Sequence, residues 1–176
     1  MNELIEMKIP SNGLEKNLAP FFFRSGNTCK IAAQIHKLVG GDVFEIQPAN
    51  DYPASYNDVL TLAKQEIRSG VKSELKNKIA GVEQYEIIFI GYPNWWNTFP
   101  APVSTFLSEF SFEGKTIVPF YTHGGGGSGR SYTDITELCP GSEVLEGFSI
   151  NGYAVNENNI DVKEWIKSNL WLKLIS

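Results

Sequence analysis

A run of three phenylalanines, residues 21–23, ends at a short loop of polar and small residues, residues 24–28. The loop leads directly into a helical pattern, in which apolar side chains recur at Ile31, Ile35 and Leu38. A strand, a tight loop and a helix N-terminus in this order favour phosphate binding, because the first N–H groups of the helix are unpaired and the helix dipole attracts an anion. The residues that we expect at this phosphate site are Phe23, Arg24, Ser25, Gly26, Asn27 and Thr28.

The composition of the loop narrows the class of ligand. Ser25, Asn27 and Thr28 can donate side-chain hydrogen bonds, and Gly26 lets the backbone approach a ligand closely. In this loop no lysine follows a GxxxxG pattern and the strand does not lead into a GxGxxG, which argues against a nucleoside triphosphate and against a dinucleotide bound here. The alternative is an ordinary helix start, capped by Ser25 or Asn27. We favour a phosphate monoester on a smaller ligand.

The pattern of apolar residues places this loop in an alternating series of strands and helices. Strands are predicted at 18–23, 42–46, 86–91, 116–121 and 143–145, and helices directly after the loop and at about 56–69, 100–110, 131–138 and 161–170. Such alternation predicts an α/β fold with three layers, in which helices cover both faces of a parallel sheet. Pro20 cannot donate a ladder hydrogen bond, so we expect a bulge or a shortened pairing in the first strand.

Two further loops are expected at the same edge of the sheet as the phosphate loop, because the carboxyl ends of parallel strands meet there. The loop after the third strand contains two adjacent tryptophans, which could form a stacking wall for a flat aromatic ligand. The loop after the fourth strand is rich in glycine and permits close backbone approach. Together the loops predict a planar ring system with a phosphate tail, for which flavin mononucleotide (FMN) is the obvious candidate. The expected residues are Pro93, Asn94, Trp95, Trp96, Asn97, Thr122, His123, Gly124, Gly125 and Ser128.

Length and composition limit the possible classes of protein. The 176 residues suit one domain, which we place at residues 18–176, after a weakly structured tail or edge segment at residues 1–17. The formal net charge of −5 has no basic run, which argues against nucleic-acid binding. No segment is apolar enough for a membrane span or a signal peptide, and the two cysteines form no metal or disulfide framework. We therefore expect a cytoplasmic protein, either a monomer or a homodimer.

Several ordered motifs resemble those of short bacterial flavodoxin-like proteins, from about residue 18 to residue 170. These motifs are Phe22, Arg24-Ser25-Gly26-Asn27-Thr28, Tyr52-Pro53 with Tyr56, Gly91-Tyr92-Pro93-Asn94-Trp95-Trp96, Val118-Pro119-Phe120-Tyr121-Thr122-His123-Gly124-Gly125, Gly129-Arg130-Ser131 and Leu138-Cys139-Pro140-Gly141. The resemblance implies a five-stranded parallel sheet in the order 2-1-3-4-5. It also implies that the FMN phosphate binds at Ser25, Asn27 and Thr28, with the isoalloxazine between the loops at Trp95 and His123.

The chain departs from this family beside the phosphate site. Phe23 stands where the family usually has a serine, which removes a hydroxyl worth about 1 kcal/mol toward a phosphate. Pro20 and the longer N-terminal segment are further differences. One hypothesis is therefore a flavodoxin-shaped module that has lost FMN and acts through binding partners.

Two redox hypotheses remain. The first is an electron carrier that exchanges electrons with a partner protein. The second is a reductase that uses NAD(P)H and a small acceptor such as a quinone. The loops at residues 92–102 and 121–130 contain no Asp or Glu, which argues mildly against a strongly reducing carrier. His123 could be a catalytic proton donor or could only shape its loop.

Overall fold

The computed structural model describes residues 16–156, 161–170 and 173. Residues 1–15, most of the predicted tail, lie outside this range. The first strand begins at Asn17, one residue earlier than the predicted domain boundary, and this asparagine is buried. Its side-chain amide donates a hydrogen bond to the carbonyl of Val39 at 2.8 Å. Asn17 therefore belongs to the folded domain.

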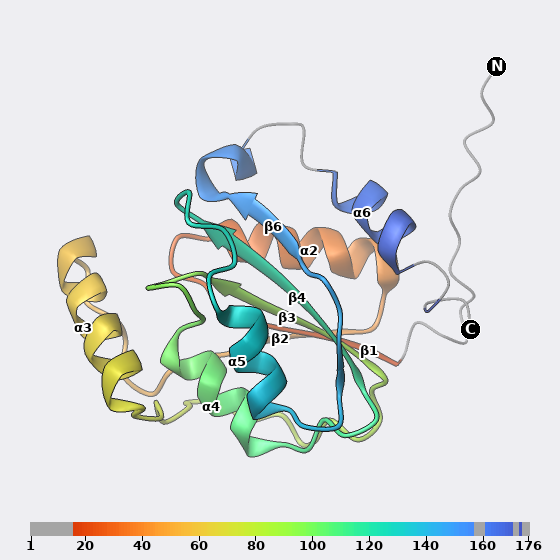
Figure 1. Ribbon diagram of the computed structural model, residues 1–176, viewed down its shortest axis with the longest axis horizontal. Coiled ribbons are helices and arrows are strands. Elements are labelled where there is room, and N and C mark those ends of the chain that lie inside the picture. Colours follow the sequence, from red (N-terminus) through yellow and green to blue (C-terminus); the bar gives the residue numbers. More distant parts are fainter. Residues whose placement is uncertain (1–15, 157–160, 171–172, 174–176) are drawn as a thin grey trace.

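The strands form one parallel sheet in the order β2-β1-β3-β4-β5, with β6 also paired to β4 (Figure 1). This order confirms the prediction. Strands three and four extend further than predicted, so that Tyr92, Pro93, Thr122 and His123 end strands instead of lying in loops. The strands are β1 (Asn17–Phe21), β2 (Asp42–Glu45), β3 (Ile87–Pro93), β4 (Thr116–His123), β5 (Glu143–Val144) and β6 (Phe148–Asn151).

Pro20 interrupts one ladder and leaves the other intact. All four residues from Leu18 to Phe21 pair with β2. Toward β3, pairs form at Leu18 and Phe21 with the same offset, and Ala19 and Pro20 are unpaired. The prediction of a shortened pairing is therefore confirmed, and no bulge is present because the register does not change.

The predicted fifth strand is present as β5, and β6 follows it as an additional strand, so the sheet has six strands. β5 pairs with the beginning of β4, and β6 pairs with its end, where Asn151 lies opposite His123. The sequence analysis missed β6. Because β6 extends along β4 to the carboxyl edge, it places the short 3₁₀ helix η1 (Gly152–Asn156) beside the start of the first helix (Figure 1).

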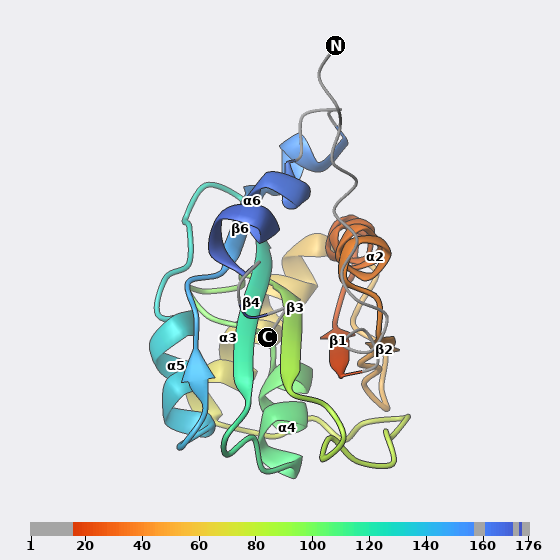
Figure 2. The same ribbon diagram turned by 90° about the vertical axis from the view of Figure 1, so that its right-hand side faces the viewer.

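Helices cover both faces of the sheet, as predicted. α2 and α6 lie on one face, and α4 and α5 lie on the other (Figures 1 and 2). Each face carries its own apolar core, because residues of β1, β3 and β4 alternate between the two sides. The helices on the faces are α2 (Asn27–Val39), α4 (Ala101–Glu109), α5 (Ser131–Leu138) and α6 (Val162–Asn169).

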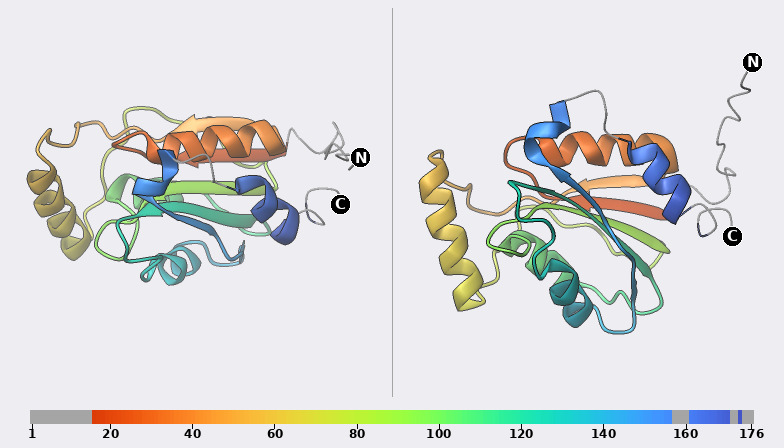
Figure 3. Two further views of the ribbon diagram at one scale, coloured as in Figure 1. Left: turned by 90° about the horizontal axis from the view of Figure 1, so that it is seen from above. Right: turned by 45° about the horizontal axis from the view of Figure 1, so that its top comes forward.

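The remaining helix, α3 (Tyr56–Ser69), does not lie over the sheet. It stands beyond the carboxyl ends of the strands (Figures 1 and 3). Only Val59 and Ala63 of its residues are buried, and Gly70 ends it in the left-handed conformation. Among the described residues, no helix has the length and apolar character needed to cross a membrane.

Candidate cofactor site at the carboxyl edge of the sheet

The N-terminus of α2 is open. Its N-cap is Gly26, with φ of 82°, and no side chain caps the helix. Within the described part of the chain, the backbone N–H groups of Asn27, Thr28 and Cys29 have no acceptor, whereas that of Lys30 already bonds the carbonyl of Gly26. The alternative of a helix start capped by Ser25 or Asn27 is therefore wrong.

The polar side chains of the loop are held in different ways. Asn27 Nδ2 donates to the carbonyl of Gly152 in η1 at 3.1 Å. The Thr28 hydroxyl is buried 3.4 Å from that of Thr122 in β4. Ser25 is exposed. The structure thus brings the loop, η1 and the end of β4 together around the start of α2.

The side chains of Arg24 and Phe23 contact other parts of the protein and not the start of α2. The Arg24 guanidinium donates to the carbonyl of Ala54 at 2.7 Å and more weakly to that of Pro53, so it ties the loop to the segment before α3. The half-buried Phe23 ring stacks on Phe21, with centroids 5.9 Å apart. Its side chain therefore packs with the core on the side of α2.

The two tryptophans after β3 occupy different environments. Trp95 is buried, and its indole packs edge-on against the rings of Phe22 and Tyr52. Trp96 is 44% exposed and donates its indole N–H to the carbonyl of Leu60 in α3 at 2.9 Å. Lys64 lies over its ring, 4.7 Å from the centroid. One tryptophan is therefore part of the core, and the other lies at the surface.

The backbone of this loop forms a tight two-residue turn. Trp95 and Thr98 exchange backbone hydrogen bonds of 2.8 and 3.1 Å. The residues between them, Trp96 and Asn97, both have positive φ, at 51° and 68°. A large aromatic residue rarely adopts this conformation, and such local strain is concentrated at functional sites.

The loops after β3 and β4 are joined by hydrogen bonds. The backbone N–H of Asn94 donates to Thr122, at 2.7 Å, and its side chain donates to Gly127. The N–H of Arg130 donates to the carbonyl of Asn97, also at 2.7 Å. The side-chain amide of Asn94 and the backbone carbonyl of Asn97 therefore have partners in the opposite loop, and the two loops form one rigid unit.

The glycine-rich loop after β4 borders open space. A Cβ atom built at Gly124 or Gly125 would have no neighbour within 4 Å, and the same holds for Gly26 across the edge of the sheet. The ring of His123 accepts a hydrogen bond at Nδ1 from the N–H of Gly125 at 2.9 Å. This contact shapes the start of the loop. The Ser128 carbonyl accepts a hydrogen bond from the Ser131 hydroxyl at 2.8 Å, at the end of the loop.

Tyr92, a buried residue near the end of β3, contacts residues that precede and follow the glycine-rich loop. Tyr92 donates its hydroxyl hydrogen bond to Ser131 at 2.9 Å and stacks on Tyr121 with centroids 5.6 Å apart. Burial raises the pKa of Tyr92 well above its usual range, so its hydroxyl stays protonated. Tyr52 is likewise kept neutral, because burial and a 2.7 Å hydrogen bond to Glu66 raise its pKa.

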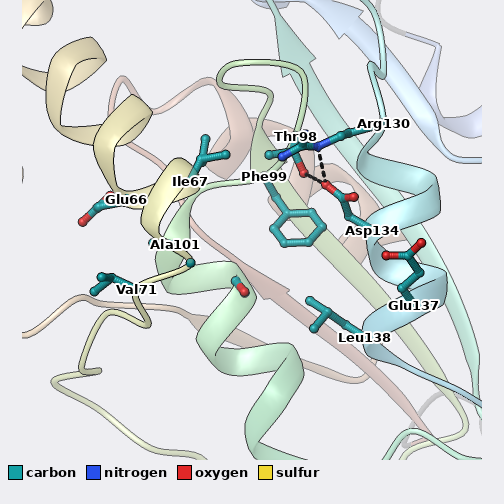
Figure 4. A pocket seen from close by; sticks show the side chains of 12 residues that line it. Glu66, Ile67, Val71, Thr98, Phe99, Ala101, Arg130, Asp134, Glu137 and Leu138 are labelled. Atoms are coloured by element: carbon teal, nitrogen blue, oxygen red, sulfur yellow. Dashed lines mark hydrogen bonds and ion pairs between the residues drawn. The ribbon is translucent and has the colours of Figure 1, made fainter.

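A cavity of about 290 Å³ lies behind the joined loops, between α3, α4 and α5 (Figure 4). The ring of Phe99 lies at its centre, with Ile67 of α3 on one side and Leu138 of α5 on the other. Asp134 and Thr98 line the same cavity. Asp134 was missed by the sequence analysis, because nothing in the sequence indicates that α5 contacts the loop after β3.

The comparisons with known proteins agree with this architecture. The flavodoxin family model matches residues 16–169. A candidate flavoprotein from Bacteroides uniformis is 31% identical with a TM-score of 0.74, and the match covers 86% of this chain and 97% of that one. A second, from Bacteroides eggerthii, is 29% identical with a TM-score of 0.73, covering 88% and 97%.

A more distant structure contains the cofactor itself. The flavoprotein from Lactobacillus acidophilus in complex with FMN is 20% identical, with a TM-score of 0.62 and coverage of 81% of this chain and 97% of that one. No curated protein matches the sequence. The family match spans nearly the whole described domain. The strand order found here is that of flavodoxin. The chain therefore belongs to the flavodoxin family.

Proposed function

We propose that this protein binds FMN at the carboxyl edge of its sheet and functions as an electron-transferring flavoprotein. The observation that carries the proposal is the open start of α2, where three N–H groups converge without an acceptor in the described chain. This start follows β1, and β2 and β3 flank β1 on opposite sides, so the order of strands reverses here. Such switch points are where α/β sheets bind ligands.

The residues present fit the cofactor. The N–H groups of Asn27, Thr28 and Cys29 suit a phosphate, which supplies the missing acceptors and interacts favourably with the helix dipole. The open space at Gly26, Gly124 and Gly125 suits the close approach of a ligand. The bound flavin supplies the redox chemistry, and the protein sets its orientation and its potential.

Of the two tryptophans, we assign the contact with the ring system to the exposed Trp96 and a supporting role to the buried Trp95. We assign His123 to the shaping of its loop, because its Nδ1 is occupied by the N–H of Gly125. The side-chain amide of Asn94 and the backbone carbonyl of Asn97 hold the loops together, and we assign the side-chain amide of Asn97 to contact with the ligand.

The charges near the loops favour a second candidate, an NAD(P)H-dependent reductase of small acceptors such as quinones. The carboxylate of Asp134 contacts the joined loops, and it is paired with Arg130 at 3.0 Å. A strongly reducing carrier gains from unpaired negative charge beside its flavin, which this arrangement does not provide. Oxidation of NADH or NADPH by the loaded protein, with and without a quinone, separates a reductase from a carrier that requires a protein partner.

The hypothesis of a module that has lost FMN rested on Phe23 and Pro20. Pro20 keeps the register of β1, and the Phe23 ring packs on Phe21, so neither residue distorts the start of α2.

Phe23→Ser tests the effect of the missing serine hydroxyl on FMN binding. We expect it to tighten FMN binding by up to about fivefold if the serine hydroxyl reaches the phosphate. Unchanged or weaker binding would place residue 23 outside the phosphate contacts.

Titration of the apoprotein with FMN and with riboflavin tests the proposal. The two ligands differ only in the phosphate, so they measure its contribution directly. We expect saturable FMN binding with a visible flavin spectrum, and riboflavin binding at least tenfold weaker, as for the loss of one or more hydrogen bonds to a charged group. Equal affinities would contradict the assignment of the α2 N-terminus to the phosphate. No binding of either ligand would contradict the proposed function.

A further inference from the structure

One carboxylate joins the two loops assigned to the flavin ring. Asp134 lies in the first turn of α5, and its Oδ2 accepts a hydrogen bond from the hydroxyl of Thr98 at 2.5 Å. The same oxygen accepts a second hydrogen bond from Nε of Arg130 at 3.0 Å. Thr98 belongs to the loop after β3, and Arg130 ends the loop after β4. We call these three side chains the clasp (Figure 4).

The clasp lies beside a close backbone contact between the two loops. The N–H of Arg130 donates to the carbonyl of Asn97, and a Cβ atom at Gly129 would lie only 2.3 Å from that carbonyl oxygen. Thr98 also closes the tight turn by exchanging hydrogen bonds with Trp95. A change in the position of the Thr98 side chain therefore moves the turn that carries Trp96.

We propose that Asp134 is a positioning residue of the flavin site, because its carboxylate fixes the separation of the two loops. This inference rests on the proposed function, since the loops are assigned to flavin there. Asp134 touches no ligand in this account. It acts through Thr98 on one loop and through Arg130 on the other.

A purely local role for Asp134 does not account for both contacts. The pair with Arg130 is an i, i+4 ion pair, with side-chain exposures of 25% for Asp134 and 59% for Arg130, and such pairs add little to stability. The hydrogen bond from Thr98 comes from a residue 36 positions earlier in the chain, so it links α5 to another segment and is not a contact within the helix. It is a charge-assisted hydrogen bond, which is stronger than a neutral one.

The cavity provides access to the carboxylate. Thr98, Arg130 and Asp134 all line it, and its volume of about 290 Å³ accommodates a small molecule. If the side chain of Asp134 is removed, formate can therefore enter and take the place of the missing carboxylate. Formate cannot replace the hydroxyl of Thr98 in the same way, because the carboxylate would still be present.

The experiment compares four variants with the wild-type protein in FMN titrations and in measurements of the redox potential of bound FMN. We expect Asp134→Ala and Thr98→Val to weaken FMN binding by about tenfold, as for one lost hydrogen bond to a charged group, and to shift the potential. Thr98→Ser keeps the hydroxyl and should retain wild-type values. Glu137→Gln, at an exposed position one turn further along α5, is the matched control and should change neither quantity.

The decisive measurement is FMN affinity in the presence of formate. Formate should restore the FMN affinity of Asp134→Ala but leave the FMN affinity of Thr98→Val unchanged. Wild-type affinity and potential in Asp134→Ala would overturn the proposal, even if that variant melts at a lower temperature. Failure of formate to restore any affinity to a folded Asp134→Ala protein would also overturn it.

Hydrogen exchange keeps this test separate from that of the proposed function. In the apoprotein, Asp134→Ala should increase exchange of the Thr98 amide at least tenfold, because this amide closes the tight turn. Amides inside β3 should be unchanged. Unchanged exchange at Thr98 would contradict the clasp even in a protein that bound no FMN.

Discussion

The two sides of the candidate site are built in opposite ways. At the start of α2, the backbone N–H groups lack acceptors in the described chain and no side chain caps the helix. At the joined loops after β3 and β4, backbone and side-chain groups already bond one another. The difference indicates that the first side relies on a ligand to complete its hydrogen bonds. The second side supplies a preformed surface that needs no ligand to hold its shape.

This contrast suits a ligand with two unlike ends. An anionic end gains most where unpaired donors and a helix dipole meet it. A planar apolar end gains from a rigid surface, because little conformational entropy is lost when it binds. The first three predictions below each act on one side of the site, and the fourth acts on the core away from both.

The largest effect is expected at the base of the joined loops. Trp95→Ala removes a buried indole that packs on Phe22 and Tyr52, and should lower the free energy of unfolding by about 3–5 kcal/mol. Trp96→Ala, next to it, removes a partly exposed ring and should cost no more than about 1 kcal/mol. Urea denaturation of both apoproteins measures the difference. Similar losses would show that the two tryptophans are not divided between core and surface.

A new charge at the open side should act on binding and not on folding. Ser25 is exposed beside the start of α2, so Ser25→Asp places a carboxylate near the proposed phosphate. Repulsion between the two anions should weaken FMN binding by about tenfold or more, and riboflavin affinity should not change. Ser25→Asn controls for size. Equal losses for FMN and riboflavin would mean that residue 25 contacts another part of the ligand.

The backbone at the open side is the next target. Gly26 has φ of 82° and open space around it, so Gly26→Ala introduces backbone strain without a steric clash. We expect a loss of stability of about 1 kcal/mol together with weaker FMN binding. Gly124→Ala is the control, because Gly124 has equally open surroundings without a positive φ. It should change stability by less than about 0.5 kcal/mol. Equal stability losses in the two variants would refute the strain at Gly26.

The smallest effect concerns Cys139, a buried residue that follows α5 at the end of the helix away from the joined loops. Burial raises the pKa of the Cys139 thiol from 9.0 to about 12. Between these values the unfolded chain loses this proton and the folded chain keeps it, so stability is complete below pH 9 and falls as the pH rises. Between neutral pH and pH 9.5, the free energy of unfolding of the wild-type protein should fall by roughly 0.5–1 kcal/mol more than that of Cys139→Ala. Parallel pH profiles for the two proteins would contradict the burial of this thiol.

Much of the fold could be predicted because its signals are local. The apolar pattern of residues 86–91 and the proline and glycine positions around α4 and α5 mark elements that the structure contains. The strand β6 was missed although Phe148 and Ile150 alternate between Gly147 and Gly152, since the preceding short strand was taken as the end of the sheet. The position of α3 beyond the sheet could not be predicted, because periodicity identifies a buried face but not what covers it.

The candidate site shows the same division. The residue types around Gly26 predicted an anion-binding loop, and the structure adds that no side chain caps it. The sequence gives no means of distinguishing Trp95 from Trp96, since only their neighbours in space differ. Asp134 contacts Thr98 across 36 residues, so its role depends entirely on tertiary structure.

The central claim is that the open start of α2 binds the phosphate of FMN. Amide NMR spectra of the ¹⁵N-labelled apoprotein, titrated with FMN and with riboflavin, test it most directly. We predict that FMN causes large shifts at the amides of Asn27, Thr28 and Cys29, and that riboflavin shifts the loops near Trp96 and Gly125 without reproducing those changes. If FMN binds while these three amides shift no more than they do with riboflavin, the phosphate lies elsewhere and the account is wrong.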